Sequence, residues 1–468
     1  MYVTLMALAG LQAATTQAMP NAIDRAAEQL QPAVIIAGEE ETPRSIEALM
    51  AELAVPGVSV AIIEDNEIVA ARSFGWARHG EGWVAQPMTT DTRFQVASLS
   101  KAVSAAGTAI WADTRGIALD APVQPLLGDW TLENGEDVSL ADLLSHRGGT
   151  TVSGFPGYGP DQEIPTLDAI LDGVDGASNE KVRVEPEARG RFRYSGGGYT
   201  VVQKAIEASE GEGFAAVMDR LLLSPLGMSA SQFNEPATAA SNAHDADGQP
   251  IAGGHRSQPE AAAAGLWSTP SDVARFVIAM NRAAAGEDGG PISPAMADFL
   301  LTAPDDSSVY AHGFGVVTEG GLRRFAHSGS NIGMKSILFG WPEAKAGMVI
   351  LTNSERGPIL YRALADALAE EMGLPLPYRE EVEAASWSEA ALARYEGLYR
   401  LDEYTYDLVR HEGGLAMIAS GGEPFAVRLL ADGRLLRLVD QQLWGVVEDE
   451  NGGIGALTLR GTPLPRAH

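Results

Sequence analysis

The chain has 468 residues, of which 45% are hydrophobic, so it is long enough to bury a large core and to form more than one domain. Its formal net charge of −29 repels phosphate backbones and anionic lipid headgroups, so we expect no nucleic acid or membrane-surface partner. The chain contains no cysteine, which excludes disulfides, thiolate nucleophiles and cysteine-based metal sites.

The first twenty residues predict an export signal. Residues 1–14 are a largely apolar run, and small residues that suit a cleavage site follow near Ala18. The first basic residue is Arg25, so the charged start of a signal peptide is missing. The run is short for a bilayer, and we expect no membrane span. We therefore predict a signal peptide over residues 1–20 and a periplasmic or secreted protein; an N-terminal extension of a cytoplasmic protein is the alternative.

Residues 21–375 predict one large α/β (α+β) domain. Two β-rich runs at 58–63 and 68–74 flank a polar tip and predict an antiparallel hairpin. Strand-like runs return between 313 and 353, and a helix is expected over 359–372. Helices alternate with Gly/Pro-rich loops over 117–320. We expect an antiparallel sheet made from both ends of the domain and flanked by helices, plus an all-helical subdomain.

Ser98 and Lys101 stand at the start of an apolar, alanine-rich segment that predicts a helix to about Trp111, with Gly116 as its stop. Residues three apart share a helix face, so Lys101 lies over the turn that carries Ser98. Burial lowers the pKa of a lysine, which can then take the proton of a serine nucleophile. The S-x-x-K pattern also arises by chance, and a second one occupies the polar stretch 178–181.

Tyr194 lies just before a glycine cluster at 196–198 and a predicted helix, so its ring can project from a loop into a cleft. A phenol beside Lys101 can ionise or share a proton, and it is therefore a candidate for the second proton-handling group. A tyrosine that only packs at a helix entry is the alternative.

The segment His327 to Ser330 ends a β-like run with small residues. Gly329 has no side chain to block a close approach, and His327 adds a donor near a leaving group or carboxylate. A structural histidine is the alternative. Three scattered histidines, His244, His255 and His312, show no metal-ligand spacing, and we expect surface positions for them. We expect no metal or other cofactor.

The end of the chain predicts a separate small domain. Residues 376–390 follow Pro375, contain Pro377 and an acidic run, and are interpreted as a linker. From 391 to 468, seven or eight short strand-like runs alternate with turn residues, which favours a small antiparallel β-barrel or sandwich without helices.

Five ordered segments within residues 45–373 resemble the serine β-lactamase-like superfamily of β-lactamases, penicillin-binding peptidases, D-aminopeptidases and esterases. SLSK at 98–101 matches its S-x-x-K motif, YSG at 194–196 stands at Y-x-N, and HSG at 327–329 stands at K-T-G. LLSHRGG at 143–149 and AAAAGLWSTPSDVARF at 261–276 are similar to two further family segments. The C-terminal strands resemble a lipocalin-like barrel appended to some of its peptidases.

The resemblance implies a serine hydrolase that works through an acyl-enzyme on Ser98. Lys101 and Tyr194 would move the proton, and the backbone N–H groups of Ser98 and Ser330 would form the oxyanion hole. His327 would orient the substrate or help protonate the leaving group. Gly196 stands where the family has Asn and His327 where it has Lys, so we expect esters, amides or D-amino-acid peptides as substrates and weak or no β-lactamase activity.

Two other functions stay open at this point. The chain can be a catalytically idle sensor that binds penicillin or peptidoglycan. It can also be an oligomeric peptidase in which the C-terminal barrel drives assembly and selects substrates by size.

Overall fold

The computed structural model describes residues 21–39, 42–233, 240–305, 309–376, 379–401, 404–420, 424–438, 442–450, 452–459 and 462–467. The predicted signal peptide, residues 1–20, lies outside this part of the chain. Of the described helices, none is both long and apolar enough to cross a membrane.

The predicted sheet is confirmed. It has seven antiparallel strands in the order β4-β3-β2-β11-β10-β9-β8. The pairing of β2 with β11 joins the first third of the chain to residues near 350, so both ends of the domain build one sheet. The strands are β2 (Gly57–Glu64), β3 (Glu67–Arg78), β4 (Gln86–Pro87), β8 (Gly315–Glu319), β9 (Leu322–Asn331), β10 (Met334–Trp341) and β11 (Ala346–Thr352).

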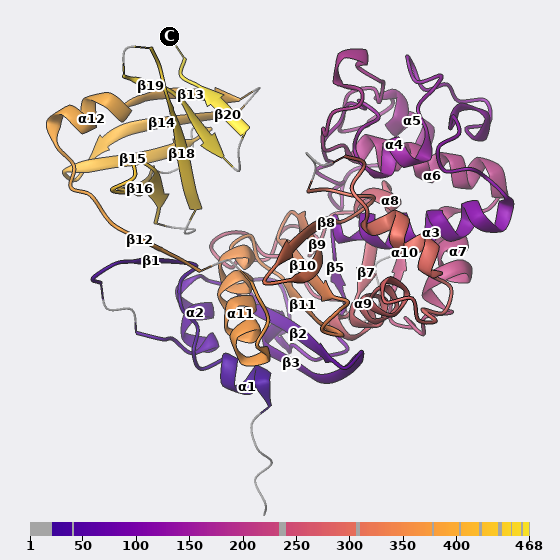
Figure 1. Ribbon diagram of the computed structural model, residues 1–468, viewed down its shortest axis with the longest axis horizontal. Helices are drawn as coiled ribbons and strands as arrows, with labels where there is room; N and C mark the ends of the chain where they lie inside the picture. The colour runs from indigo at the N-terminus through magenta and orange to yellow at the C-terminus, as the bar shows by residue number, and fades with distance from the viewer. Residues whose placement is uncertain are drawn as a thin grey trace, which may run out of the picture.

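Helices cover both faces of this sheet (Figure 1). On one face, α1 (Ala22–Ala26), α2 (Ile46–Glu52) and α11 (Gly357–Met372) bury a core with the outward residues of β2, β10 and β11. On the other, α9 (Pro270–Ala284) and α10 (Pro294–Leu301) join a larger core. Helix α9 begins at a capped turn, in which the Thr269 side chain accepts the N–H of Asp272 and Pro270 occupies the first turn.

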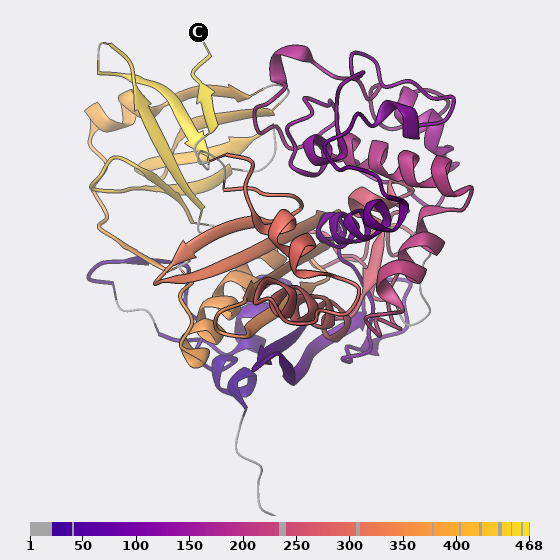
Figure 2. The same ribbon diagram turned by 45° about the vertical axis from the view of Figure 1, so that its right-hand side comes forward.

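The helical subdomain packs against the same larger core and stands beside the sheet in Figure 2. Its α-helices are α3 (Leu99–Arg115), α4 (Leu140–Leu144), α5 (Leu167–Asp172), α6 (Gly196–Glu210), α7 (Phe214–Met218) and α8 (Ala261–Ala264). Short turns of other helix types are η1 (Gln124–Leu126), η2 (Pro186–Ala188) and η3 (Asp219–Leu223), and a three-stranded sheet joins β5 (Phe94–Gln95), β7 (Leu266–Ser268) and β6 (Gln232–Phe233).

The predicted C-terminal barrel is confirmed, with eight antiparallel strands in sequence order. The bridge between Tyr399 and Arg466 brings its first and last strands together and nearly closes it. A core that includes Tyr399, Leu408 and Trp444 fills the interior. The strands are β13 (Gly397–Leu401), β14 (Tyr404–His411), β15 (Gly414–Ala419), β16 (Pro424–Leu429), β17 (Leu435–Arg437), β18 (Gln442–Glu448), β19 (Ile454–Leu459) and β20 (Thr462–Pro465).

The connection to the barrel is more ordered than a linker. Strand β12 (Glu380–Val382) pairs in parallel with β1 (Val34–Ile36), and helix α12 (Glu389–Tyr395) leads into the barrel. Val34, Ile36 and Val382 bury against two barrel leucines, Leu430 and Leu436. The apolar residues of these short runs therefore attach the start of the chain to the barrel, a long-range pairing that the acidic composition of 376–390 does not reveal.

Candidate active site

A strained turn presents Ser98 at the start of α3. Ala97, directly before it, is buried with φ of +52°, a conformation that costs energy for any residue with a side chain. Ser98 is the N-cap residue of the helix, yet its side chain makes no capping hydrogen bond. Among the described residues, its backbone N–H donates to no other backbone group. Both the hydroxyl and the N–H are therefore available to a substrate.

Lys101 points its ammonium at Ser98, as the helical spacing predicts. The Lys101 Nζ lies 3.2 Å from the Ser98 Oγ and donates to the carbonyl of Ala263, on α8, at 2.8 Å. The side chain is only 2% exposed, and this burial lowers the pKa of Lys101 to about 7. Near neutral pH about half of the lysine is thus the free amine, which can accept a proton.

Tyr194 reaches the same hydroxyl. Its side chain hydrogen-bonds to Ser98, and the Lys101 Nζ lies 5.1 Å from the centre of its ring. Burial raises the pKa of Tyr194 to about 12, so the phenol keeps its proton at neutral pH. Of the two roles that the sequence leaves open, ionising or sharing a proton, the environment favours the second.

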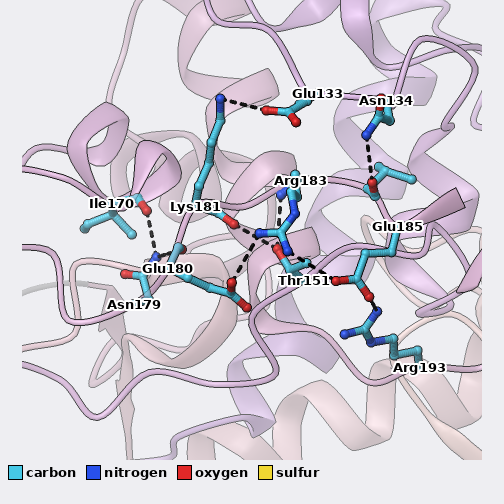
Figure 3. A network of polar contacts seen from close by, with 11 residues as sticks. Glu133, Asn134, Thr151, Ile170, Asn179, Glu180, Lys181, Arg183, Glu185 and Arg193 are labelled. Carbon is cyan, nitrogen blue, oxygen red and sulfur yellow. Dashed lines mark hydrogen bonds and ion pairs between the residues drawn. The ribbon is translucent and has the colours of Figure 1, made fainter.

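A polar network holds the loop that carries Tyr194 (Figure 3). The Thr151 hydroxyl donates to the Lys181 carbonyl at 2.9 Å and accepts the Arg183 N–H at 3.1 Å. Glu185 then pairs with both Arg183 and Arg193, and Arg193 is the residue directly before Tyr194. The second S-x-x-K lysine, Lys181, pairs instead with Glu133 at 3.1 Å and has no part in the site.

The glycines after Tyr194 let the start of α6 pack tightly on the loop at 150–155. A Cβ on Gly197 would lie 2.6 Å from the Thr151 carbonyl oxygen, and one on Gly196 would lie 3.0 Å from the Phe155 ring. Ser195 caps the helix and donates to Thr151 at 2.8 Å. Gly196, which replaces the Asn of the family motif, therefore stands where the aromatic ring of Phe155 limits the space.

His146 was not identified as a site residue from the sequence, although the segment 143–149 was noted. The structure places its ring 4.3 Å from that of Tyr194 and 5.0 Å from that of Tyr310, centre to centre. Its Nδ1 accepts the backbone N–H of Ser195 at 3.1 Å. Burial, then the charge of Lys101, lowers the pKa of His146 well below the ordinary value, so the ring is neutral. His146 thus supports Tyr194 without adding charge.

His327 faces the site from β9, where the sequence predicts it. Its Nδ1 donates to the Ser328 carbonyl at 2.7 Å, because a carbonyl can only accept. The other nitrogen, Nε2, lies 3.2 Å from the hydroxyl of Tyr310. Burial, with the nearby charge of Lys101, lowers the pKa of His327 to about 3. His327 is therefore a neutral ring whose two nitrogens both have protein partners.

Gly329 fixes how closely β9 approaches the Ser98 turn. A Cβ there would lie 2.1 Å from the Val96 carbonyl oxygen, so only glycine fits. The sequence predicts room at Gly329 for a bound substrate; in the structure the missing side chain makes room for the backbone before Ser98. Ser330, two strand positions beyond Ser328, is exposed at the cavity like that residue. Strand β8 pairs with β9 only as far as Ala326, which leaves the backbone edge of residues 327–331 uncovered by it.

A cavity of about 600 Å³ brings these groups together. Among the described residues, its lining carries hydroxyls, one imidazole and small or apolar groups, and neither a lysine, an arginine nor a carboxylate. The lining residues are Ser98, Ser153, Gly154, Tyr194, Tyr310, Gly315, Ala326, His327, Ser328, Ser330 and Ile337. Five of the six predicted site residues either line it or contact Ser98, and Gly329 lies behind it.

The expectation of surface histidines is wrong for two of the three. His244 is fully buried, with its Nδ1 2.9 Å from the Asn353 carbonyl oxygen. His312 is 8% exposed and stacks on Phe299 with ring centres 3.9 Å apart. Both are held by backbone carbonyls, which a single sequence cannot indicate. Within the described ranges, no group of three or more His, Asp or Glu side chains is arranged to hold a metal ion.

The mixed α/β fold with a serine, a buried lysine and a tyrosine at one cavity is that of a serine hydrolase. The chain belongs to the Beta-lactamase family, whose model matches residues 43–371. The predictions of this family, this fold and a serine hydrolase are confirmed.

Individual relatives support the same grouping. The chain is similar to Esterase EstB of Burkholderia gladioli, with 28% identity over 206 residues that cover 42% of this chain and 52% of the esterase. The chain thus matches about half the length of that relative. The fold is also similar to SurE with D-Leu, with a TM-score of 0.59, 20% identity and coverage of 90% of this chain and 97% of SurE. The octameric penicillin-binding protein homologue from Pyrococcus abyssi has a TM-score of 0.56, 22% identity and coverage of 90% and 98%.

Proposed function

We propose that the protein hydrolyses carboxylic esters through an acyl-enzyme on Ser98. The observation that carries the proposal is the contact of the buried Lys101 Nζ with the Ser98 Oγ at 3.2 Å. The lowered pKa of Lys101, about 7, makes the free amine available to take the hydroxyl proton as Ser98 attacks the ester carbonyl.

The remaining steps use groups at the same cavity. The carbonyl oxygen of the substrate becomes an oxyanion, and the N–H groups of Ser98 and Ser330 are its proposed donors. Tyr194, whose hydroxyl carries its proton in the resting enzyme, passes that proton to the departing alkoxide and regains one from Lys101. Water then attacks the acyl-enzyme, gives its proton back through the same groups, and releases the carboxylic acid and free Ser98.

His327 has a proposed role in substrate orientation rather than as an acid, because its ring is neutral and both nitrogens are engaged. Neither a lysine nor an arginine stands at this position to hold the carboxylate of a β-lactam. Together with Gly196 in place of Asn, this supports the proposal of weak or no β-lactamase activity.

Ser98→Ala tests the proposal, with hydrolysis of p-nitrophenyl butyrate as the assay. We expect a loss of at least about a hundredfold in kcat, since no other group can form the acyl-enzyme. The matched control is Ser178→Ala at the exposed serine of the second S-x-x-K pattern, which should leave kcat unchanged. Unchanged turnover in folded Ser98→Ala would refute the assignment of the nucleophile.

Tyr194→Phe separates proton transfer from packing, because it removes only the hydroxyl. We expect slower acylation, measured as the rate of the p-nitrophenol burst, with an unchanged melting temperature. A normal burst rate would show that Tyr194 only packs.

A second candidate substrate class is amides and peptides of D-amino acids. It is favoured by the fold likeness to SurE with D-Leu, which extends over 90% of this chain. The octameric relative from Pyrococcus abyssi supports an oligomeric, size-selective form of this alternative. Light scattering together with assays on D-alanyl peptides would distinguish it from a monomeric esterase. Labelling of Ser98 by a fluorophosphonate without turnover of any substrate would favour the sensor alternative.

A further inference from the structure

The cavity beside Ser98 carries no fixed charge on its described lining, and this has a consequence for the substrate. A carboxylate that enters it loses water contacts and finds no cationic side chain on the wall to replace them. The net charge of −29 adds a long-range repulsion of anions. Because no cationic side chain stands on the described lining, we expect the cavity to discriminate against negatively charged substrates.

The imidazole of His327 does not supply the missing charge, because burial and the nearby charge of Lys101 lower its pKa to about 3. The Ser328 carbonyl accepts from its Nδ1 at 2.7 Å. The Tyr310 hydroxyl, which also hydrogen-bonds with Tyr199, lies 3.2 Å from its Nε2. Both ring nitrogens therefore face protein groups.

The two arginines that neighbour His146 and Tyr194 in sequence do not supply a positive charge to the cavity either. Arg147 follows His146 in sequence and pairs with Asp305, while Arg193 precedes Tyr194 and pairs with Glu185 (Figure 3). Neither arginine lines the cavity.

Apolar side chains lie next to Tyr310 and on the cavity wall. Phe192 packs against Tyr310 with ring centres 5.3 Å apart and keeps 49% of its surface exposed. Val309, next to Tyr310 in sequence, is 68% exposed. Ile337 and Ala326 add aliphatic atoms to the wall. Exposed apolar groups that surround an uncharged cavity are typical of a binding surface for an apolar ligand.

We propose that Tyr310 and His327 on the cavity wall, together with the exposed Phe192 ring that packs on Tyr310, form a subsite for an uncharged, apolar group of the substrate. Tyr310 is a specificity-determining residue of this subsite, because its ring lines the cavity and its hydroxyl lies 3.2 Å from the His327 Nε2, where a substrate carboxylate would otherwise bind. This inference rests on the proposed ester hydrolysis at Ser98 and names the substrate class that the site takes.

Matched esters test the proposal in both halves of the substrate. In the acyl half, the esters are p-nitrophenyl hexanoate, mono-p-nitrophenyl adipate and its methyl ester, which share one leaving group. In the leaving-group half, they are the hexanoate esters of 4-hydroxybenzoate and of methyl 4-hydroxybenzoate. Each kcat/KM is divided by the rate constant of alkaline hydrolysis of the same ester, so that only enzyme selectivity remains.

We expect the normalised kcat/KM of the neutral ester to exceed that of its carboxylate counterpart by about 10- to 100-fold in at least one series. The carboxylate ester should differ mainly by a raised KM, with kcat little altered. Equal normalised kcat/KM for charged and neutral esters in both series would overturn this inference while leaving the esterase proposal standing. Absence of turnover on every ester would overturn the proposed function and the inference together.

Phe192→Arg adds a cation at a half-exposed position outside the catalytic groups, and Phe192→Gln is its uncharged control. Phe192→Arg should reduce the preference for the neutral ester by about fivefold or more, whereas Phe192→Gln should alter it by less than about twofold. Fluorophosphonate labelling of Ser98 confirms that both variants retain a folded site. A preference that does not differ between the two variants would place the discriminating surface elsewhere and refute the subsite.

Discussion

Lys101→Arg separates the two ways in which a cation can assist Ser98. Arginine has a similar length, keeps a positive charge and can still donate to the carbonyl of Ala263, which accepts from the Lys101 Nζ at 2.8 Å. It cannot act as a base, because its pKa is above about 12. The substitution therefore preserves electrostatic assistance and removes proton acceptance.

The expected loss follows from the fraction of free base. Burial lowers the pKa of Lys101 to about 7, so roughly nine-tenths of the lysine is the free amine at pH 8. An arginine has less than about one part in ten thousand in that form. We therefore expect Lys101→Arg to reduce the acylation rate by at least about a thousandfold, down to the residual contribution of binding and the oxyanion donors.

The same assignment predicts the pH dependence of the unaltered enzyme. A base acts only when deprotonated, so kcat/KM should be constant above the pKa of Lys101 and fall as the pH drops through about 7. Well below pH 7 the decrease approaches tenfold per pH unit. His327 and His146 do not interfere, because burial lowers the pKa of each below this range.

Stopped-flow measurement of the p-nitrophenol burst at pH 8 gives the acylation rate, and a series from pH 5 to 9 gives the profile. Lys181→Arg, at the lysine paired with Glu133, is the matched control and should behave as the unaltered enzyme. The reasoning fails if folded Lys101→Arg keeps more than a tenth of the acylation rate. It also fails if kcat/KM is constant between pH 5 and 8.

Three further outcomes test other parts of the structure. Glu260 is fully buried, neither carboxylate oxygen has a hydrogen-bond partner in the part of the chain that the structure describes, and burial raises its pKa from 4.5 to about 7. The folded state thus binds this proton more tightly than the unfolded state, and stability is lost as the pH rises from 4.5 through 7, by about 3 kcal/mol in all. Urea unfolding at pH 8 should show Glu260→Gln more stable than the unaltered protein by up to about this amount, with little difference at pH 4. The control Glu163→Gln, on an exposed loop, should match the unaltered protein at both pH values. Equal stability of Glu260→Gln and the unaltered protein at pH 8 would contradict this prediction. Gly329→Ala should lower the melting temperature, and it should lower kcat by about tenfold or more. The reason is that its Cβ would lie 2.1 Å from the Val96 carbonyl oxygen and 2.3 Å from the Ser336 Oγ. Activity equal to that of the unaltered protein would show that the turn before Ser98 moves freely. EDTA should leave ester hydrolysis unchanged, and a loss that added metal restores would refute a metal-free mechanism.

Local sequence signals account for much of the fold. The helix after Ser98 ends at Gly116, whose φ of +66° suits glycine, and the hairpin of β2 and β3 turns at a short polar tip. Such signals depend on neighbours in the chain and can be recognised in one sequence. The parallel pairing of β1 with β12 joins a three-residue strand at the start of the hydrolase domain to one in the connection to the barrel, and no local pattern indicates it.

The site residues also fall into two groups, those that local sequence spacing indicates and those that only the fold brings together. Ser98 and Lys101 are one helical turn apart, so their contact follows from spacing alone. Tyr310 carries no such signal: it stands in none of the motifs of the sequence, and only the fold brings its hydroxyl to His327. His146 lies in a segment whose pattern was noted, yet its position against Tyr194 depends on a backbone φ of +58° and on a hydrogen bond from Ser195. These residues belong to the site through tertiary contacts that a single sequence does not encode in any local form.

The chemistry of the cavity depends on which groups stay neutral as much as on which groups react. Burial lowers the pKa of Lys101 and raises that of Tyr194, so at neutral pH the amine is the base and the phenol is the acid. A histidinium at position 327 would add a second positive charge near Lys101, lower its pKa further and attract anions. Burial and the charge of Lys101 keep the ring neutral instead. The burial that shifts these pKa values is therefore one physical cause behind both proposals, proton transfer at Ser98 and the selection of uncharged substrates.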